Sequence, residues 1–262
     1  MDVPNCGHER MDRAAPKPVR LVAFDIDGTL LGDDEAANRF RSAWQALDGR
    51  KRPLLVYNSG RPINDILALV DVDQLPPPDY VIGGVGTMMA DGRKRKRLQA
   101  FTAELGSPID VKAVTAIMET VEGAVPQAAV DQHAHKASWW LPEAREAEIA
   151  AIGQRLASAG LDVKLIYSSS RDLDILPRAG GKGSALAWIC RELTVDLGEV
   201  VVAGDTGNDR EMFDIPRVRG VVVANALAEL RRVAEHERRH FLARNSYADG
   251  VLEGLRHWGV IE

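Results

Sequence analysis

Short apolar runs alternate with helical patterns along the chain from about Val19. The first run, VRLVAFD, reads as a buried strand, and the segment DEAANRFRSAWQALDG after it reads as an amphipathic helix that Gly49 is expected to end. The apolar positions of this helix recur at i, i+3, i+7 and i+10, namely Ala37, Phe40, Trp44 and Leu47. The runs PLLVYNS, YVIGG, VVVAGD and GVVVAN supply further apolar strands. Strands that alternate with helices predict an α/β fold built on a parallel sheet.

The pattern changes in the middle of the chain. The segment GTMMADGRKRKRLQ contains the Asp-Gly signal of a hairpin, and KASWWLP, DVKLIYSS and DLDILP read as strands without crossover helices between them. Two amphipathic helices lie among these strands, and the first is expected to begin with Ser107 as N-cap and Pro108 at its first helical position. We therefore predict an α+β insert over residues 84–178, within a core made of residues 18–83 and 179–262.

The composition is that of an ordinary globular protein. Of 262 residues, 45% are hydrophobic and 27% are charged, and the net charge is -5, so the balance favours neither nucleic acid nor a membrane surface as a partner. No stretch approaches the roughly 20 apolar residues that span a bilayer. Cys6 and Cys190 show neither metal-ligand nor disulfide spacing, which favours a reducing cytoplasm. Residues 1–17 are expected to be a disordered tail, in which Met11 is an alternative start.

Polar side chains follow three of the predicted strands at the point where each strand ends. Asp25 ends the first strand, Ser59 the second, and Asp205 the run VVVAGD. Lys182 lies between glycines at the start of a helical pattern, and Asp209 follows Asp205 by one loop. Because ligands of parallel α/β sheets bind outside the carboxyl ends of the strands, we expect these side chains to meet at one edge. Roles in turns and helix caps are the alternative for the acids.

These residue types suit phosphoryl transfer through an aspartyl phosphate. A phosphate monoester is a dianion, so a carboxylate approaches it only where Mg²⁺ and a lysine, here Lys182, offset the repulsion. We interpret Asp25 as nucleophile and metal ligand, and Asp27 as the acid that protonates the leaving alcohol and the base that then activates water. The carbonyl of Asp27, Asp205 and Asp209 complete the expected Mg²⁺ site, with orientation of Lys182 as an alternative role for Asp209.

Four segments in this order, DIDGT, NSGR, GKGSAL and GDTGND, resemble the four motifs of the haloacid-dehalogenase superfamily of phosphohydrolases. The resemblance covers nearly everything after Val19 and implies a Rossmann-like core with an inserted cap of the C2B type, whose members act on sugar phosphates. Within this group, GDDEA, VYNSGR, IGGVGTMM, IYSSSRDLDILP and GVLEGLRHWG are similar to the sucrose-phosphate phosphatases and, more closely, to the mannosylfructose-phosphate phosphatases. Ser59 stands where many relatives have Thr, a difference that keeps the hydroxyl donor.

The residues expected to bind phosphate or substrate lie in and around these motifs. Ser59 is expected to donate a hydrogen bond to a phosphate oxygen, while Gly28 and Thr29 shape the loop that carries the two aspartates. The full expected set is Gly28, Thr29, Ser59, Gly60, Arg61, Lys136, Lys182 and Asn208.

Three further features have plainer interpretations. The basic run RKRKR at residues 93–97 is typical of a solvated sheet edge, with a nucleic-acid patch as the alternative. His133 and His135 can share a strand face, but no third ligand is spaced for a closed metal site. Trp139 and Trp140 point to opposite faces of a strand, so one is expected in the core, while the other either stacks on a sugar or covers the cap sheet.

Together these features predict a Mg²⁺-dependent phosphatase that acts on a small-molecule sugar phosphate. The resemblance implies a fructose-containing disaccharide phosphate, either mannosylfructose-phosphate or sucrose-6-phosphate, and a functional link to a glycosyltransferase that makes it. A phosphatase of another sugar phosphate and a phosphomutase on the same fold are the alternatives. A non-catalytic sugar-phosphate-binding protein is disfavoured because Asp25 and Asp27 are both present.

Overall fold

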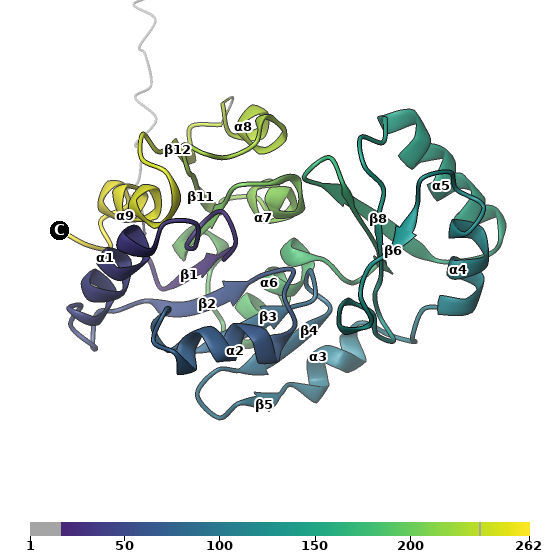
Figure 1. Cartoon of the computed structure of the whole chain (residues 1–262). Helices are drawn as coiled ribbons and strands as arrows, with labels where there is room; N and C mark the ends of the chain where they lie inside the picture. Colours follow the sequence, from purple (N-terminus) through teal and green to yellow (C-terminus); the bar gives the residue numbers. More distant parts are fainter. Residues whose placement is uncertain (1–16, 236) are drawn as a thin grey trace, which may run out of the picture.

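The computed structural model describes residues 17–235 and 237–262. Its strands form two sheets, and Figure 1 shows the smaller sheet, together with α4 (Val111–Met118) and α5 (Glu146–Ser158), set apart from the larger one. The tail expected over residues 1–17, with Cys6 and Met11, lies outside the described residues except for Lys17. Within the described residues, every helix is too short or too polar to traverse a lipid bilayer.

The larger sheet has eight strands in the order β12-β11-β10-β1-β2-β3-β4-β5, and its first six strands are parallel. The six are β1 (Leu21–Phe24), β2 (Leu54–Asn58), β3 (Tyr80–Gly83), β10 (Val200–Gly204), β11 (Arg219–Val222) and β12 (His240–Leu242). The chain runs outward from β1 to β3 on one side and from β10 to β12 on the other. The direction therefore reverses between β1 and β10, where open α/β sheets bind ligands at the carboxyl ends of their strands. This order confirms the predicted Rossmann-like parallel core.

Six helices complete the parallel part of the core: α1 (Asp34–Gln45), α2 (Ile63–Asp71), α6 (Lys182–Glu192), α7 (Arg210–Asp214), α8 (Ala228–Ala234) and α9 (Tyr247–His257). Helix α1 packs against α9, and α6 packs against α7. The predicted apolar face of α1 is buried, and the ring of Phe40 stacks on Trp44 and meets Phe24 edge-on. Helix α1 ends at Gln45 rather than at the expected Gly49.

The hairpin signal at residues 86–99 belongs to a different part of the fold than expected. Strands β4 (Met88–Asp91) and β5 (Lys96–Arg97) extend the large sheet as antiparallel neighbours of β3. Helix α3 (Gln99–Glu104) follows, and its Phe101 packs edge-on against Trp188 of α6 at 5.2 Å. These residues pack with the core rather than with the insert expected over residues 84–178. We therefore propose that the insert begins after α3.

The smaller sheet carries a hydrophobic core of its own. Its antiparallel strands have the order β6-β7-β9-β8, with the bounds β6 (Val125–Pro126), β7 (Ala137–Trp140), β8 (Val163–Ser168) and β9 (Asp172–Pro177). Helices α4 and α5 lie on the face turned away from the large sheet (Figure 1). The buried residues between sheet and helices include Val114, Met118, Trp139, Ile152, Leu156 and Leu173. Helix α4 begins later than expected, because the side chain of Asp110, rather than Ser107, caps it by accepting a hydrogen bond from the amide of Ala113.

The contacts that join the insert to the core include two polar pairs and one apolar cluster. The Lys164 ammonium lies 2.6 Å from the Glu211 carboxylate. His133 Nε2 lies 2.9 Å from the hydroxyl of Thr87, whose own hydrogen is donated to the carbonyl of Gly84. His133 is therefore the donor, and burial, with the nearby Lys136 charge, lowers its pKa to about 4. The apolar cluster consists of Val85, Ile166 and Leu176.

The basic run at residues 93–97 lies on exposed sheet edge, as expected for a solvated edge. Three of its five cations are paired with acids of the same region: Arg93 with Asp79, Lys94 with Asp91, and Arg95 with Asp71. Such pairing leaves little free positive charge for a nucleic-acid contact.

Truncation of Phe101 tests whether α3 belongs to the core. Phe101→Ala should lower the free energy of unfolding by about 3 to 5 kcal/mol, because it removes a buried ring and its contact with Trp188. The measurement is urea unfolding. Val72→Ala is the control, since this side chain is 67% exposed, and its change should stay within about 0.5 kcal/mol. Equal effects of the two substitutions would contradict the assignment of α3.

Candidate active site

The first aspartate is fixed by the backbone of the central strands. Asp25 directly follows β1, and its amide donates to the carbonyl of Ala203 in β10 at 3.0 Å. The chain then turns at Gly28, which has a φ of 82°. A Cβ at this position would lie 2.1 Å from Oδ2 of Asp205. Glycine is therefore required for two reasons, the left-handed conformation and the close approach of the Asp205 carboxylate.

A buried lysine holds the aspartates together. The ammonium of Lys182, at the start of α6, donates to Asp25 Oδ1 at 2.6 Å and to Asp209 Oδ1 at 2.7 Å. The side chain of Lys182 is fully buried. Its backbone is fixed as well, because the Asn58 side chain at the end of β2 donates to the carbonyl of Lys182 at 2.9 Å. The amine of Lys182 therefore lies between the acids that follow the carboxyl ends of β1 and β10.

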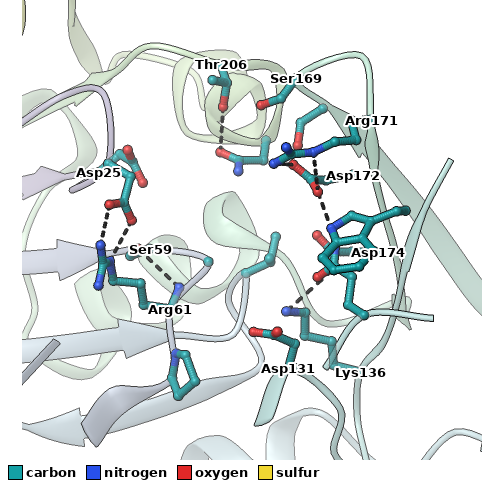
Figure 2. Close-up of a pocket in the computed structure, with 18 of the residues that line it drawn as sticks. Asp25, Ser59, Arg61, Asp131, Lys136, Ser169, Arg171, Asp172, Asp174 and Thr206 are labelled. Carbon is teal, nitrogen blue, oxygen red and sulfur yellow. Dashed lines mark hydrogen bonds and ion pairs between the residues drawn. The ribbon is translucent and has the colours of Figure 1, made fainter. Parts of the chain in front are cut away.

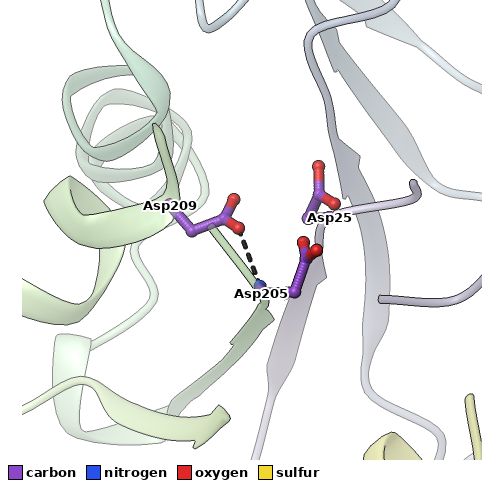
Figure 3. Close-up of side chains that lie close together, drawn as sticks. All are labelled: Asp25, Asp205 and Asp209. Carbon is purple, nitrogen blue, oxygen red and sulfur yellow. Dashed lines mark hydrogen bonds between the residues drawn. The ribbon is translucent and has the colours of Figure 1, made fainter. Parts of the chain in front are cut away.

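Asp205 and Asp209 come from the loop after β10 (Figure 3). The second oxygen of Asp209 accepts hydrogen bonds from the amides of Asp205 at 3.0 Å and Thr206 at 3.2 Å. Asp205 Oδ1 accepts from the hydroxyl of Thr29 at 3.1 Å. Both oxygens of Asp209 therefore have partners, whereas Asp205 has one protein donor and lies against the turn at Gly28.

The carboxylates are crowded and deeply buried. Burial is the main cause that raises the pKa of Asp25 to about 7, with the Lys182 charge acting in the opposite direction. Burial, followed by the charge of Asp25, raises the pKa of Asp205 to about 8. Burial by itself would lower the pKa of Lys182, but the charges of Asp209 and Asp25 outweigh it and raise this pKa above its usual value.

The donor set suits a divalent metal ion. One carboxylate oxygen from each of Asp25, Asp205 and Asp209 lies within 4.8 Å of the others. These three acids face one ammonium, that of Lys182, so ionisation of all of them leaves an excess of two negative charges. A hard cation with oxygen ligands, such as Mg²⁺, fits both the charge and the ligand type.

A cavity of about 440 Å³ opens in front of Asp25, between the core and the insert (Figure 2). Core residues that line it include Asp25, Asp27, Ser59, Gly60, Arg61, Thr206 and Asn208. Residues of the insert that line it include Gln127, Asp131, Lys136, Trp140, Arg171, Asp172 and Asp174. The cavity thus has an acidic floor in the core and a polar wall supplied by the insert.

Asp27 and Arg61 form an ion pair inside this cavity. The guanidinium donates to both oxygens of Asp27, at 2.6 and 2.7 Å. Asp27 has a side chain 53% exposed, unlike the buried Asp25 two residues earlier. Ser59, at the end of β2, is nearly fully buried, and its hydroxyl accepts from the amide of Arg61 at 3.2 Å.

The wall from the insert carries acids and one buried lysine. Lys136 Nζ lies 3.4 Å from Asp174 Oδ1, which also accepts a hydrogen bond from the Ser138 hydroxyl. The Gln127 amide donates to Asp172 at 3.0 Å. Asp172 and Asp174 face the cavity because they alternate along β9 with Leu173, which lies in the core of the insert.

The two tryptophans separate as expected from strand alternation. Trp139 is packed in the core of the insert, whereas Trp140 is 42% exposed and lines the cavity. The paired histidines are occupied by local hydrogen bonds, since the amide of His135 bonds Nδ1 of His133, and His135 Nε2 lies 3.1 Å from the carbonyl of Gly106.

The structure divides the expected site residues into two groups. Seven line the cavity: Asp25, Asp27, Ser59, Gly60, Arg61, Lys136 and Asn208. The other five, Gly28, Thr29, Lys182, Asp205 and Asp209, lie around and behind Asp25. Residues of the site that were not predicted from the sequence include Asn58, Gln127, Asp131, Arg171, Asp172 and Asp174. The alternation of acidic and apolar residues in DLDILP was the signal available for Asp172 and Asp174.

Comparison with known proteins places the chain in a family. The model of the sucrose-6F-phosphate phosphohydrolase family matches residues 18–259. The mannosylfructose-phosphate phosphatase of Agrobacterium fabrum is 49% identical over 245 residues, which cover 93% of this chain and 98% of that protein. Sucrose-phosphatase 1 of Nicotiana tabacum is 31% identical, and the match covers 95% of this chain and 61% of the tobacco protein. The crystal structure of a Synechocystis sucrose-phosphatase with sucrose and phosphate has a TM-score of 0.83 at 29% identity, covering 92% of this chain and 98% of that one.

Stability in the absence of metal should depend on pH through the acidic cluster. The pKa values of Asp25 and Asp205, about 7 and about 8, exceed the ordinary value of 3.8. The metal-free fold should therefore lose stability as the pH rises from about 4 to about 8, because the folded state must give up protons that it holds more tightly than the unfolded chain does. A bound divalent cation replaces those protons.

We thus expect Mg²⁺ to raise the melting temperature of EDTA-treated protein more at pH 8 than at pH 5. Thermal unfolding at both pH values, with and without Mg²⁺, measures the effect. Asp205→Asn should reduce the difference between the two pH values, because it removes one of the shifted groups. An equal Mg²⁺ effect at both pH values would contradict this account of the cluster.

Proposed function

The chain belongs to the sucrose-6F-phosphate phosphohydrolase family of haloacid-dehalogenase phosphatases, and from this membership we propose that it hydrolyses a fructose-containing disaccharide phosphate with the help of Mg²⁺. As a member it is a hydrolase of phosphoric monoesters that acts on sugar phosphates; the disaccharide, the metal and the mechanism are the proposal. The observation that carries it is the position of Asp25, held by Lys182 at the floor of a cavity whose opposite wall comes from the insert.

Asp25 is the proposed nucleophile. Lys182 binds Oδ1 of Asp25, and the attack on phosphorus is assigned to the second oxygen. The bond from phosphorus to the sugar oxygen breaks as the bond to Asp25 forms, and Asp27 gives the leaving oxygen a proton that it has taken from solvent after release from Arg61. Water then attacks phosphorus, Asp27 takes up a proton from that water, and inorganic phosphate leaves with Asp25 restored. Transfer of the phosphoryl group to a second sugar hydroxyl instead of water would make the protein a phosphomutase.

Asp27 must leave Arg61 to perform these proton transfers. The two side chains form a bidentate pair in the cavity. A substrate phosphate is the stronger partner for a guanidinium, because it carries more charge and offers three oxygens. We propose that the entering phosphate takes over Arg61 and frees Asp27, with the Ser59 hydroxyl, Gly60 and Asn208 as further contacts to the substrate.

The metal site is proposed from Asp25, the carbonyl of Asp27 and Asp205. Mg²⁺ bound there would supply positive charge to the phosphoryl oxygens as negative charge builds on them. Asp209 has both oxygens occupied, by Lys182 and by two backbone amides. Its proposed role is therefore to orient Lys182, the alternative considered from the sequence.

The wall from the insert is suited to a neutral polyol. The carboxylates of Asp131, Asp172 and Asp174 accept hydrogen bonds, which sugar hydroxyls donate. Trp140 offers a partly exposed ring in the same wall, and rings of this kind pack against the apolar faces of sugars. We also propose that the protein acts in the cytoplasm and is functionally linked to a glycosyltransferase that makes the sugar phosphate.

Replacement of the nucleophile tests the chemistry. Asp25→Asn should lower kcat by at least about 10³-fold on every phosphate ester, because the amide is a poor nucleophile. Phosphate release from sucrose-6-phosphate, mannosylfructose-phosphate and p-nitrophenyl phosphate is the measurement. Asp34→Asn, on the exposed first turn of α1, is the matched control and should retain wild-type rates. Activity of Asp25→Asn within tenfold of wild type would exclude Asp25 as nucleophile.

Truncation of the cavity wall tests sugar selection. Trp140→Ala and Lys136→Ala should lower the ratio of kcat/KM for a disaccharide phosphate to that for p-nitrophenyl phosphate by roughly 5- to 150-fold, the value of one lost contact of 1 to 3 kcal/mol. Val125→Ala is the control: Val125 pairs with Trp140 across the sheet but does not line the cavity. If neither wall substitution changes the ratio by more than about twofold, these residues do not select the sugar.

A further inference from the structure

The loop after β11 contacts the active-site turn at Gly28, although none of the four motifs includes a residue of this loop. Asn225 in this loop has both ends of its side-chain amide occupied. Its Nδ2 donates to the carbonyl of Gly28 at 2.7 Å, and its Oδ1 accepts from the amide of Tyr247 at 2.8 Å. One side chain thus ties the turn that carries the aspartates to the first residue of α9.

The same loop also contacts the second half of the acidic cluster. The amide of Leu227, two residues after Asn225, donates to the carbonyl of Asp205 at 2.8 Å. The loop is anchored on the other side by the amide of Ala224, which donates to the carbonyl of Asn245 at 3.0 Å. Asn225 therefore lies on a segment that is bonded to both of the loops expected to hold the metal.

Gly28 is the point where these two loops come closest. Its backbone lies so near Asp205 that a Cβ on it would overlap the carboxylate. Asp27, whose carbonyl is a proposed metal ligand, is the preceding residue, and Thr29, which bonds Asp205, is the next. A shift of the Gly28 peptide would therefore move an expected ligand and loosen the contact that orients another.

Helix α9 supports the far end of the same turn, at Gly32. The ring of Tyr247 covers Gly32, where a Cβ would lie 2.3 Å from the ring. Tyr247 has a φ of 52°, a left-handed conformation that a non-glycine residue adopts at a cost. The hydrogen bond from its amide to Asn225 helps to hold this conformation, so Asn225 and Tyr247 support the turn from Gly28 to Gly32 together.

We propose that Asn225 is a positioning residue, which fixes the Gly28 carbonyl and thereby the spacing between the Asp25–Asp27 segment and Asp205. This inference rests on the proposed phosphatase reaction and its metal site. Asparagine suits the position because its amide presents one donor and one acceptor at a fixed separation. Aspartate keeps the acceptor for Tyr247 but would place an oxygen against the Gly28 carbonyl, and alanine loses both bonds.

The test compares Asn225→Ala and Asn225→Asp with wild type. Both variants should lower kcat at least tenfold for a disaccharide phosphate and for p-nitrophenyl phosphate alike, since the phosphoryl site is common to both. Asn225→Ala should also raise, by threefold or more, the Mg²⁺ concentration that gives half of the Mg²⁺-dependent increase in melting temperature. This second measurement needs no substrate.

Asn245→Ala is the matched control. The Asn245 side chain bonds Glu253 in the second half of α9, and its hydrogen bonds to the described residues do not include the turn at Gly28. If Asn225 acted only by supporting α9, Asn225→Ala and Asn245→Ala would change kcat and the Mg²⁺ midpoint equally, and the inference would be wrong. Asn225 variants within twofold of wild type in both quantities would overturn it as well.

The test of Asn225 can be distinguished from a test of the proposed substrate. If wild type hydrolyses p-nitrophenyl phosphate but no disaccharide phosphate, the substrate proposal is wrong, and p-nitrophenyl phosphate with the Mg²⁺ titration still decides the role of Asn225. If wild type shows neither hydrolysis nor a Mg²⁺ effect on melting, the proposed reaction fails, and the positioning role is overturned with it.

Discussion

The buried ammonium of Lys182 is the constraint on which the active site depends. A charge that is removed from water is tolerated only beside opposite charge, and removal of one partner of such a pair typically costs about 3 to 5 kcal/mol. Lys182 has two such partners, Asp25 after β1 and Asp209 after β10, so the ends of the two central strands are joined through one side chain. The glycines at the start of α6, the Asn58 contact and the turn at Gly28 all serve this arrangement.

The insert has its own hydrophobic core and contacts the site from the opposite side. The proposed phosphate chemistry and the proposed sugar contacts therefore belong to separate packed units, which meet through polar pairs such as Lys164 with Glu211 and His133 with Thr87. Because burial keeps His133 neutral over most of the physiological range, that contact is a hydrogen bond rather than a titrating ion pair. Side chains in the wall of the insert can change without disturbing Lys182, since none of them contacts the acidic cluster.

The sequence was most informative where one local rule decides the structure. Apolar runs predicted the parallel strands, and polar residues at their ends predicted that Asp25, Ser59 and Asp205 would meet. It was least informative about partners distant along the chain: the hairpin at residues 86–99 was recognised, but nothing local shows that β4 pairs with β3 rather than within the insert. The start of α4 was misplaced for a related reason, because Ser107 and Asp110 are both acceptable caps and the local sequence does not decide between them.

The contrast between Asp25 and Asp27 shows how one short loop separates two chemical roles. Both are aspartates, two residues apart, yet the first is buried against a fixed lysine and the second is half exposed beside an arginine. A nucleophile benefits from a fixed position, because misplacement by about 1 Å can cost roughly 10²-fold in rate. An acid that must first give up a proton and later accept one benefits from contact with solvent and from a partner that substrate can displace. The burial of each residue thus agrees with its proposed role, and motif spacing alone does not supply that distinction.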